Sequence, residues 1–276
     1  MKLKTNISIV LYKTSLEEIV PQLNEFLTNP QVSRVFLIDN SPNKQQLPDS
    51  LSNKHRVRYF FTGKNLGYGV AHNVALSESI KRDVAYHLVI NPDVKCKASD
   101  ISTLMNLMEE RKEIGLVMPK VIDREGNMQF LAKLLPTPID LIVRRFTPKG
   151  WFQRRKKRFE LQRANFSKEI DVPYLSGCFM FLRMEAIKRV GMFDERYFLY
   201  PEDIDLTRRI HQFYKTIYFP LVTVNHLHQR ASYKSLRLLF IHIWNMIKYF
   251  NKWGWIFDKE RSEWNKKLLK ELNYNK

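Results

Sequence analysis

Apolar and polar positions in the amino-terminal part of the chain follow a pattern typical of strands that alternate with helices. Apolar side chains recur at every second position over residues 7–11, which predicts a strand, and Ser15 followed by Glu18 predicts a capped helix toward residue 27. The same reasoning predicts strands at residues 32–39, 57–62 and 86–91 and a helix at residues 68–81. This alternation predicts an α/β fold with a mostly parallel sheet flanked by helices, which binds ligands at the carboxyl ends of its strands.

The second half of the chain continues this alternation with shorter elements. We expect Ser99 or Asp100 to cap a helix, and Gly126 to lie at the centre of a turn over residues 123–127. A helix is expected to stop at Gly191, because glycine favours the left-handed conformation that ends helices. The remaining predicted elements are strands at residues 114–118, 174–182, 216–219 and 222–226 and a helix from Pro201 or Glu202 to residue 214.

Two amphipathic helices are predicted at the carboxyl terminus. Apolar residues recur there at helical spacing, first as Leu236, Phe240, Ile243, Ile247 and Phe250 and then as Trp264, Leu268 and Leu272. The sequence predicts one boundary near residue 230, which separates an α/β domain over residues 1–230 from the amphipathic helices over residues 231–276.

Neither a membrane span nor an export signal is expected. The longest apolar stretch covers residues 238–250, but His242, Asn245 and Lys248 interrupt it well short of the ~20 residues that a span requires. The apolar stretch over residues 7–12 is too short for the core of a signal peptide.

The charge of the chain indicates anionic partners. A formal net charge of +18 favours nucleic acid, anionic lipid or phosphorylated small molecules, and it does not choose among them. Cys96 and Cys178 stand far apart in no metal-binding or redox spacing, which predicts two buried thiols in a reducing, cytoplasmic compartment.

Much of the positive charge lies in one segment, residues 134–169, where basic and aromatic side chains are interleaved. Its cations are Arg144, Arg145, Lys149, Arg154, Arg155, Lys156, Lys157, Arg158, Arg163 and Lys168, and its large aromatics are Phe146, Trp151, Phe152, Phe159 and Phe166. We expect a functional insertion outside the core. Interleaved cations and aromatics suit a surface that meets anionic lipid headgroups. The alternative is a solvated loop.

Acidic and polar side chains cluster where strands are predicted to end. Asp39, Asn40 and Ser41 form the first cluster, and Asn91 and Asp93 form the second. The third, Glu202, Asp203 and Asp205, follows a loop. Carboxylates at the carboxyl ends of strands point into the crevice where an open α/β sheet binds its ligand. Each cluster alone is equally compatible with a turn or a helix cap.

A glycine-rich stretch, TGKNLGYGVAHN at residues 62–73, joins a predicted strand to a predicted helix. Its glycines allow backbone amides to approach a phosphate closely. The spacing fits neither the GxGxxG dinucleotide fingerprint nor the GxxxxGK[ST] phosphate loop, which argues against a dehydrogenase and against a P-loop ATPase.

Together these motifs resemble the family 2 glycosyltransferases, and specifically their rhamnosyltransferase-like branch. The resemblance runs from the first strand to His226 and rests on DNS at 39–41, GKNLGYGVAHN at 63–73, INPD at 90–93, LSGCFMFLR at 175–183 and FDERYFLYPEDIDLTRR at 193–209. It implies the A-type glycosyltransferase (GT-A) fold, with a Rossmann-like, mostly parallel central sheet, flanking helices and a carboxyl-terminal helical extension.

The resemblance also implies roles for individual residues. Asp203 would be the catalytic base that deprotonates the acceptor hydroxyl, so that the anomeric carbon is inverted. Gly177 and Glu202 would lie on the acceptor side, and the basic and aromatic segment over residues 134–169 would face the acceptor or the membrane. The residues that would bind the nucleotide sugar are Asp39, Asn40, Asn65, Gly67, Asn73, Asn91 and Asp93.

A divalent metal is implied as well, Mg²⁺ or Mn²⁺ bridging the two phosphates. Asp93 would hold it, but Asn91 stands where many relatives carry a second aspartate, which predicts weaker binding. His226, or alternatively His228, would supply a further ligand or contact the diphosphate.

The predicted function is transfer of a sugar, rhamnose from thymidine diphosphate rhamnose, to a hydroxyl of a lipid-linked glycan in bacterial cell-surface polysaccharide synthesis, such as that of lipopolysaccharide. We expect a cytoplasmic protein that lies peripherally on the anionic inner face of the plasma membrane. Within the same class, the alternative donor is a uridine diphosphate hexose or galactofuranose. The alternatives from other classes are a nucleic-acid-binding protein, which the net charge of +18 suggests and the acidic clusters disfavour, and a non-catalytic module that binds nucleotide sugars.

Overall fold

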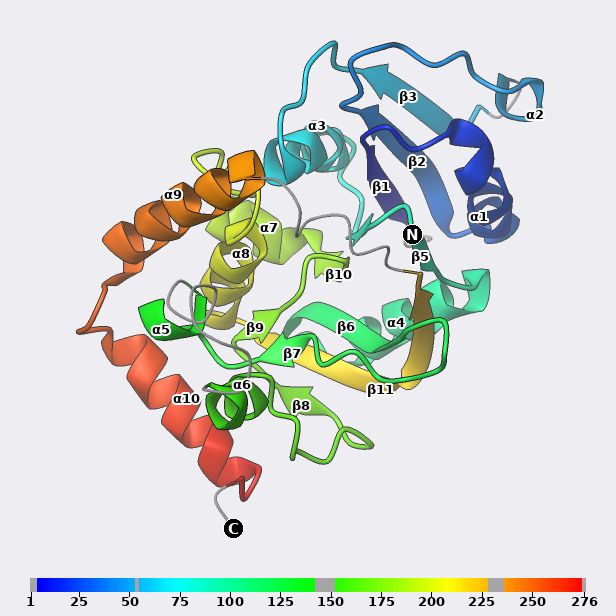
Figure 1. The fold of residues 1–276 in the computed structure, drawn as a ribbon. Helices are drawn as coiled ribbons and strands as arrows, with labels where there is room; N and C mark the ends of the chain where they lie inside the picture. Colours follow the sequence, from blue (N-terminus) through cyan, green and yellow to red (C-terminus); the bar gives the residue numbers. More distant parts are fainter. Residues whose placement is uncertain (1–3, 53–54, 142–151, 228–235, 275–276) are drawn as a thin grey trace.

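A nine-stranded sheet runs through the centre of the computed structural model, which describes residues 4–52, 55–141, 152–227 and 236–274 (Figure 1). The strand order is β3-β2-β1-β4-β10-β6-β11-β5, with β8 beside β11. The strands are β1 (Thr5–Leu11), β2 (Val32–Asp39), β3 (Val57–Phe61), β4 (Tyr86–Ile90), β5 (Val94–Lys95), β6 (Ile114–Ile122), β8 (Ile170–Asp171), β10 (Phe179–Arg183) and β11 (Lys215–His226). Two further strands, β7 (Ala132–Lys133) and β9 (Tyr174–Leu175), pair in a small second sheet.

The direction of the strands determines which loops meet at the edge of the sheet. Strands β1, β2, β3 and β4 are parallel neighbours, as are β6 and β11, whereas β10 runs antiparallel between β4 and β6. The expectation of a mostly parallel sheet is therefore confirmed. Because β10 is reversed, its amino end lies at the edge where the parallel strands have their carboxyl ends, and Phe179 pairs with Ile90 there.

Helices cover both faces of the sheet. Helices α1 and α4 contact each other and pack on one face, whereas α3, α7 and α8 contact one another and pack on the other (Figure 1). Each face has its own buried apolar layer. The helices are α1 (Leu16–Thr28), α2 (Asp49–Ser52), α3 (Tyr68–Lys81), α4 (Ala98–Glu110), α5 (Pro138–Leu141), α6 (Gln153–Phe159), α7 (Met184–Val190), α8 (Glu202–His211), α9 (Leu236–Trp253) and α10 (Lys259–Glu271).

Local sequence accounts for some helix ends. The side chain of Ser15 accepts a hydrogen bond from the amide of Glu17 at the start of α1, and Gly191, with φ of 84°, ends α7. The expected cap of α4 was wrong, because the N-cap is Lys97. The carboxylate of Asp100 lies inside the first turn and accepts a hydrogen bond from the Lys97 amide at 2.9 Å.

Two strand predictions need correction. The expected strand over residues 174–182 is broken into β9 and β10, because residues 176–178 leave the ladder. The two strands expected at 216–219 and 222–226 are one strand, β11, whose register with β6 shifts between Phe219 and Thr223. The break before β10 gives residues 176–178 a position at the edge of the sheet.

The segment over residues 134–169 does contribute to the core, contrary to expectation. Leu134, Leu135, Phe159, Leu161 and Phe166 are at most 8% exposed and belong to the apolar layer under α7 and α8. Its basic side chains point outward on α6, except Arg155, which pairs with Asp140 at 2.7 Å. Arg144, Arg145, Phe146, Lys149 and Trp151 lie outside the described residues.

The carboxyl-terminal helices share the core of the rest of the chain. Met246, Tyr249 and Phe250 of α9 and Leu268 and Leu269 of α10 belong to the same apolar cluster as α7 and α8. The expected boundary near residue 230, and His228 with it, lies outside the described residues. No helix within those residues is long and apolar enough to cross a membrane.

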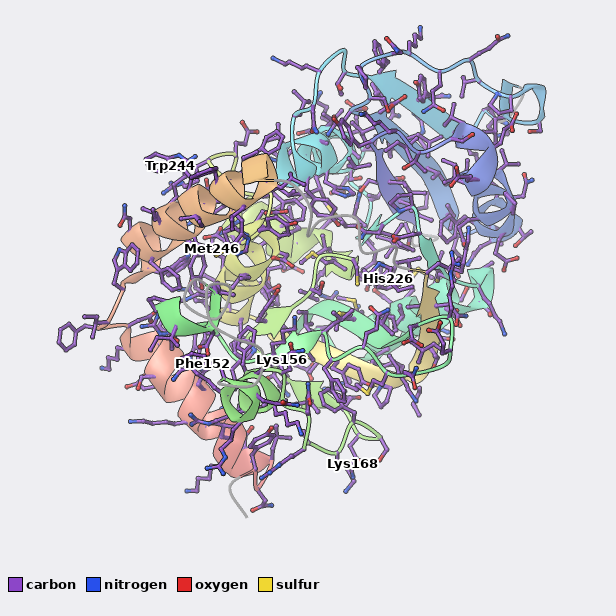
Figure 2. All side chains as sticks on the ribbon, viewed as in Figure 1. Phe152, Lys156, Lys168, His226, Trp244 and Met246 are labelled. Atoms are coloured by element: carbon purple, nitrogen blue, oxygen red, sulfur yellow. The ribbon has the colours of Figure 1, made fainter. Side chains whose placement is uncertain are left out.

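The apolar face predicted for α9 was wrong in part. Phe240 was expected on the buried face but is 69% exposed, whereas Asn245 and Met246 are about 1% exposed. Figure 2 shows Trp244 on the outer side of α9 and Met246 on its inner side. Apolar residues occur around most of this helix, so its sequence alone does not identify the side that packs.

Two buried groups of charges fasten α8 to α9 and α10. Asp205 pairs with Arg209 of its own helix at 2.8 Å and with Lys252 of α9 at 2.6 Å. Arg208 is 2% exposed and forms a two-pronged ion pair, at 2.7 and 2.6 Å, with Asp258, which caps α10. Both arginines therefore act as ion-pair partners.

Candidate functional site

Asp39 lies at the carboxyl end of β2 and is fully buried. Its carboxylate accepts hydrogen bonds from the Ser41 amide at 2.9 Å, the Tyr59 hydroxyl at 2.6 Å and the Gln45 side chain at 3.2 Å. Burial alone would raise the pKa of Asp39, but these hydrogen bonds outweigh it and the pKa lies below its ordinary value. The carboxylate is therefore charged, and it holds the loop that follows β2.

Asn40 ties this strand end to the glycine-rich loop. Its amide group donates to the Gly67 carbonyl at 2.9 Å and to the side-chain oxygen of Asn65 at 3.3 Å. The same oxygen of Asn65 accepts a hydrogen bond from the Gly67 amide at 2.9 Å. Three of the predicted nucleotide-binding residues, Asn40, Asn65 and Gly67, thus form one connected group.

Gly67 is required by the close approach of two loops. Its φ is 84°, and a Cβ at this position would lie 2.0 Å from the carbonyl oxygen of Phe198. The neighbouring Tyr68 amide donates to the same oxygen at 3.0 Å, so the amino end of α3 rests directly on the loop that precedes α8. No other residue type fits this combination of φ and space.

Asp93 and His226 lie side by side because β5 pairs with the end of β11. His226 is opposite Val94 in that pairing, and the Leu227 amide donates to the Asp93 carbonyl at 2.8 Å. His226 Nε2 lies 3.4 Å from Asp93 Oδ2, and Nδ1 lies 2.9 Å from Oε1 of Gln129. Figure 2 labels His226 at this end of β11.

This pair suits a divalent cation. If Nδ1 donates its hydrogen to Gln129, Nε2 carries the lone pair that a metal ligand needs, and Gln129 orients the ring as the outer neighbours of metal-bound histidines do. Two donor atoms 3.4 Å apart can both reach one ion at bond lengths of about 2.1 Å. The described residues contain no group of three or more acidic, histidine or cysteine side chains that could hold a metal ion. An ion bound by Asp93 and His226 would therefore also be coordinated by oxygen atoms of the bound substrate.

Residues 176–178 connect this pair to Asp203. The Cys178 carbonyl accepts a hydrogen bond from the Asn91 amide at 3.0 Å, and the Gly177 amide donates to Asp203 Oδ2 at 2.9 Å. The Gly177 carbonyl in turn accepts a hydrogen bond from the Tyr68 hydroxyl at 2.5 Å. The short loop before β10 therefore holds the INPD strand end, the glycine-rich loop and the start of α8 together.

Asp203 has the environment expected of a base. Burial raises the pKa of its carboxyl above the ordinary value, although hydrogen bonds from the Gly177 and Ile204 amides and the charge of Lys133 oppose the rise. A carboxylate with a raised pKa is a stronger proton acceptor than an ordinary aspartate. The neighbouring Glu202 is 4% exposed, and burial together with the charge of Asp203 raises the pKa of its carboxyl well above the usual range.

Two predicted site residues make contacts with neighbouring elements. The amide group of Asn73 donates to the Phe193 carbonyl at 2.9 Å and its oxygen accepts from the Phe193 amide at 3.0 Å, so this side chain joins α3 to the loop after α7. Glu202, expected on the acceptor side, is buried against α3 beside Gly69. The contacts of Asn73 satisfy its amide group, whereas Oε2 of the buried Glu202 carboxylate has no hydrogen-bond partner within the described residues.

Three residues that the sequence did not single out belong to the site. Tyr68 holds Gly177, Gln129 orients His226, and Lys133 acts on the charge of Asp203. Gln129 and Lys133 lie in a stretch without a motif, and their partners are distant in sequence. Tyr68 stands within the glycine-rich motif, where its position at the start of α3 was the available signal.

The comparisons with known proteins agree with this geometry. A model described as glycosyl transferase family 2 matches residues 10–191. The chain is 28% identical over 229 residues to N-acetylglucosaminyl-diphospho-decaprenol L-rhamnosyltransferase of Mycobacterium tuberculosis, a match that covers 76% of this chain and 73% of that protein. It is 25% identical over 156 residues to rhamnosyltransferase WbbL of Escherichia coli K12, which covers 55% of this chain and 56% of that one. The resemblance to rhamnosyltransferases is thus confirmed.

Among solved structures, that of GalNAc-T7 with UDP, GalNAc and Mn²⁺ superimposes with a TM-score of 0.60 at 14% sequence identity. The superposition covers 87% of this chain and 47% of that one, so the chain spans about half the length of GalNAc-T7. At this identity the likeness concerns the fold, and it confirms the predicted GT-A architecture.

Proposed function

Because the chain belongs to glycosyl transferase family 2, and is therefore a glycosyltransferase, we propose that it transfers rhamnose from thymidine diphosphate rhamnose to a hydroxyl of a lipid-linked glycan, with inversion at the anomeric carbon. The observation that carries this proposal is the connection of Asn91 and Asp203 through residues 176–178. A diphosphate held near Asp93 and a hydroxyl near Asp203 then face each other across one loop. The sugar is drawn from the names of the two rhamnosyltransferases that the chain resembles, and the lipid-linked acceptor from the name of the mycobacterial one.

In the proposed reaction Asp203 accepts the proton of the acceptor hydroxyl. The oxygen forms its bond to the anomeric carbon while the bond from that carbon to the diphosphate oxygen breaks on the opposite face, and the electron pair leaves with the nucleoside diphosphate. Hydrogen bonds from two backbone amides fix the carboxylate of Asp203 in place. Tyr68 stabilises this arrangement because its hydroxyl holds the carbonyl of Gly177.

Asp93 and His226 are the residues that we propose to hold Mg²⁺ or Mn²⁺. When bound, the cation neutralises the negative charge that builds on the leaving diphosphate. Support comes from the 3.4 Å separation of the two donor atoms and from the orientation of His226 by Gln129. GalNAc-T7, which shares the fold, was crystallised with Mn²⁺.

The nucleoside is proposed to bind over the strand end of β2 and the glycine-rich loop. Asp39 is charged and fixed, and Asn40, Asn65 and Gly67 present a connected set of polar groups beside it. Asn91 would contribute to nucleotide binding, because it stands at the start of the turn that carries Asp93. Asn73 and Glu202 would act indirectly, by holding α3 in place.

The protein is further proposed to lie on the anionic inner face of the bacterial plasma membrane, where a lipid-linked acceptor resides. Large apolar side chains are exposed on α9 and in the turn that follows it. Phe240 is 69% exposed, Trp244 60%, Ile256 80% and Phe257 95%. Aromatic side chains on a chain with a net charge of +18 are suited to the interface of an anionic bilayer. Sedimentation with anionic vesicles tests this association, and a chain that stays in the supernatant would contradict it.

The decisive test of the donor is a screen of nucleotide sugars. We expect the wild-type protein to release thymidine diphosphate from thymidine diphosphate rhamnose faster than it releases uridine diphosphate from uridine diphosphate glucose or galactofuranose. Chelation of divalent metal should stop the release, and added Mn²⁺ or Mg²⁺ should restore it.

Preference for a uridine diphosphate donor would support the alternative donor. Release of nucleoside diphosphate at the same rate with and without the chelator would exclude the proposed role of the metal. The absence of turnover with every donor, together with retained nucleotide binding, would favour a non-catalytic module. Binding of the chain to duplex DNA in preference to every nucleotide sugar would favour a nucleic-acid-binding protein.

A further inference from the structure

A cavity of about 390 Å³ lies on the outer side of α6, away from the site described above. Within the described residues it is lined by Gln153, Arg154, Lys157, Arg158, Arg163 and Tyr274. The volume falls in the range of small-molecule sites. Four of these six side chains carry a positive charge.

Helical spacing explains how the cations converge. Arg154 and Arg158 are one turn apart on α6, as are Gln153 and Lys157, so the two pairs share one side of the helix. The opposite side carries Phe159, which is 5% exposed in the core. The helix therefore presents its charges to the cavity because its apolar side is fixed.

The far wall of the cavity comes from the carboxyl terminus. The Tyr274 hydroxyl donates to the Lys157 carbonyl at 2.6 Å, which anchors the residues after α10 against α6. Among the described residues, no carboxylate lies within ion-pair distance of Arg154, Lys157, Arg158 or Arg163. By contrast, Arg155 on the same helix pairs with Asp140. Within the described residues the positive charge in the cavity is thus not neutralised.

We propose that this cavity binds a phosphate or diphosphate group at a second anionic site, separate from the nucleotide crevice. Arginine and lysine side chains that converge without carboxylate partners are the groups that recognise phosphate oxygens. The identity of the molecule that carries this phosphate rests on the proposed function. It is either the diphosphate of the lipid-linked acceptor or the headgroup of an anionic phospholipid.

The position of α6 relates the cavity to the acceptor side. The Phe159 carbonyl accepts a hydrogen bond from the Leu134 amide at 3.1 Å, and the ring of Phe159 lies 5.8 Å from the ammonium of Lys133. The charge of Lys133 in turn acts on Asp203. Helix α6 therefore lies between the basic cavity and the part of the site where the acceptor hydroxyl is deprotonated.

The test compares two double variants that lose the same charge. Lys157→Gln/Arg158→Gln removes two cations from the cavity, whereas Lys156→Gln/Lys168→Gln removes two exposed cations that do not line it. Figure 2 labels Lys156 on α6 and Lys168 in the turn before β8. Each protein is titrated with inorganic pyrophosphate in the presence of a metal chelator, and each is sedimented with vesicles of phosphatidylglycerol and of phosphatidylcholine.

We expect the cavity variant to bind pyrophosphate about tenfold more weakly than wild type, and the control variant to bind within about twofold, because two charge-assisted contacts are lost only in the first. A defect with pyrophosphate and unchanged sedimentation assigns the site to the acceptor diphosphate. A defect that appears only with phosphatidylglycerol vesicles assigns it to a lipid headgroup. Equal behaviour of the two variants in both assays would overturn the proposal.

Donor hydrolysis is measured in the same proteins to separate this inference from the proposed function. Hydrolysis of thymidine diphosphate rhamnose by water should be unchanged in both variants, since neither touches the nucleotide crevice. A wild-type protein that binds pyrophosphate in the cavity but turns over no donor would leave the second site standing while the proposed function fails.

Discussion

Asp203→Asn is expected to lower the rate of sugar transfer by about 10²- to 10⁴-fold, the usual contribution of a general base, while the donor still binds. The amide has nearly the same shape, and its oxygen can still accept the hydrogen bond from the Gly177 amide, so the loop over residues 176–178 keeps its position, whereas the bond from the Ile204 amide is lost. It cannot accept the proton of the acceptor hydroxyl. Release of nucleoside diphosphate in the presence of acceptor measures the rate, and a titration with the donor measures binding.

The pH dependence follows from the same carboxyl group. Burial raises the pKa of Asp203, so the wild-type rate should fall on acidification at a pH above that of an ordinary aspartate, because the protonated form is no base. Asp203→Asn should lack this fall. Glu185→Gln, which removes an exposed carboxylate on α7, is the matched control and should behave as wild type. A rate in Asp203→Asn within a few fold of the control would exclude Asp203 as the base.

Asp258→Ala is expected to destabilise the protein by about 3–5 kcal/mol, since it leaves a buried arginine without its principal partner. Arg208 is 2% exposed, and both prongs of its guanidinium bond to Asp258. The variant also removes the side chain that caps α10, through its bond with the Arg261 amide at 3.0 Å. Glu260, 2.9 Å from Arg208, remains and limits the loss.

Urea unfolding of Asp258→Ala beside Glu263→Ala tests this expectation. Glu263 lies on the same helix and pairs with Lys259 at 3.9 Å, with both side chains largely exposed, so its removal should cost less than about 1 kcal/mol. Equal unfolding midpoints for the two variants would mean that the buried pair contributes nothing measurable. The expected difference would instead mean that α10 is part of the folding unit that carries Asp203.

The sequence was most informative where local chemistry decides the structure. Helix α3 begins and ends at the predicted residues. A residue with φ of 84° cannot be part of a right-handed helix, so Gly67 fixes the start of α3 at Tyr68. Strand β2 likewise has its predicted bounds, and the motifs at its end do meet the glycine-rich loop. Short stretches of sequence were sufficient to predict the bounds of α3 and β2 and the contact between their ends.

Features that depend on distant partners could not be predicted. Asn73 stands in a convincing motif, but its amide is satisfied by Phe193, 120 residues away. The role of Gln129 depends on His226, 97 residues away. Phe159 and Phe166 stand in a basic segment that resembled a surface insertion, yet they are buried in the apolar layer under α7 and α8. In each case the packing of the sheet against its helices selects the contact.

The most direct test of the central claim, a single displacement with Asp203 as base, is the anomeric configuration of the sugar transferred by the wild-type protein, determined by nuclear magnetic resonance on the first product formed. The account predicts that this configuration is opposite to that in the nucleotide-sugar donor. Retention of the donor configuration would require a different mechanism and would contradict the role proposed for Asp203.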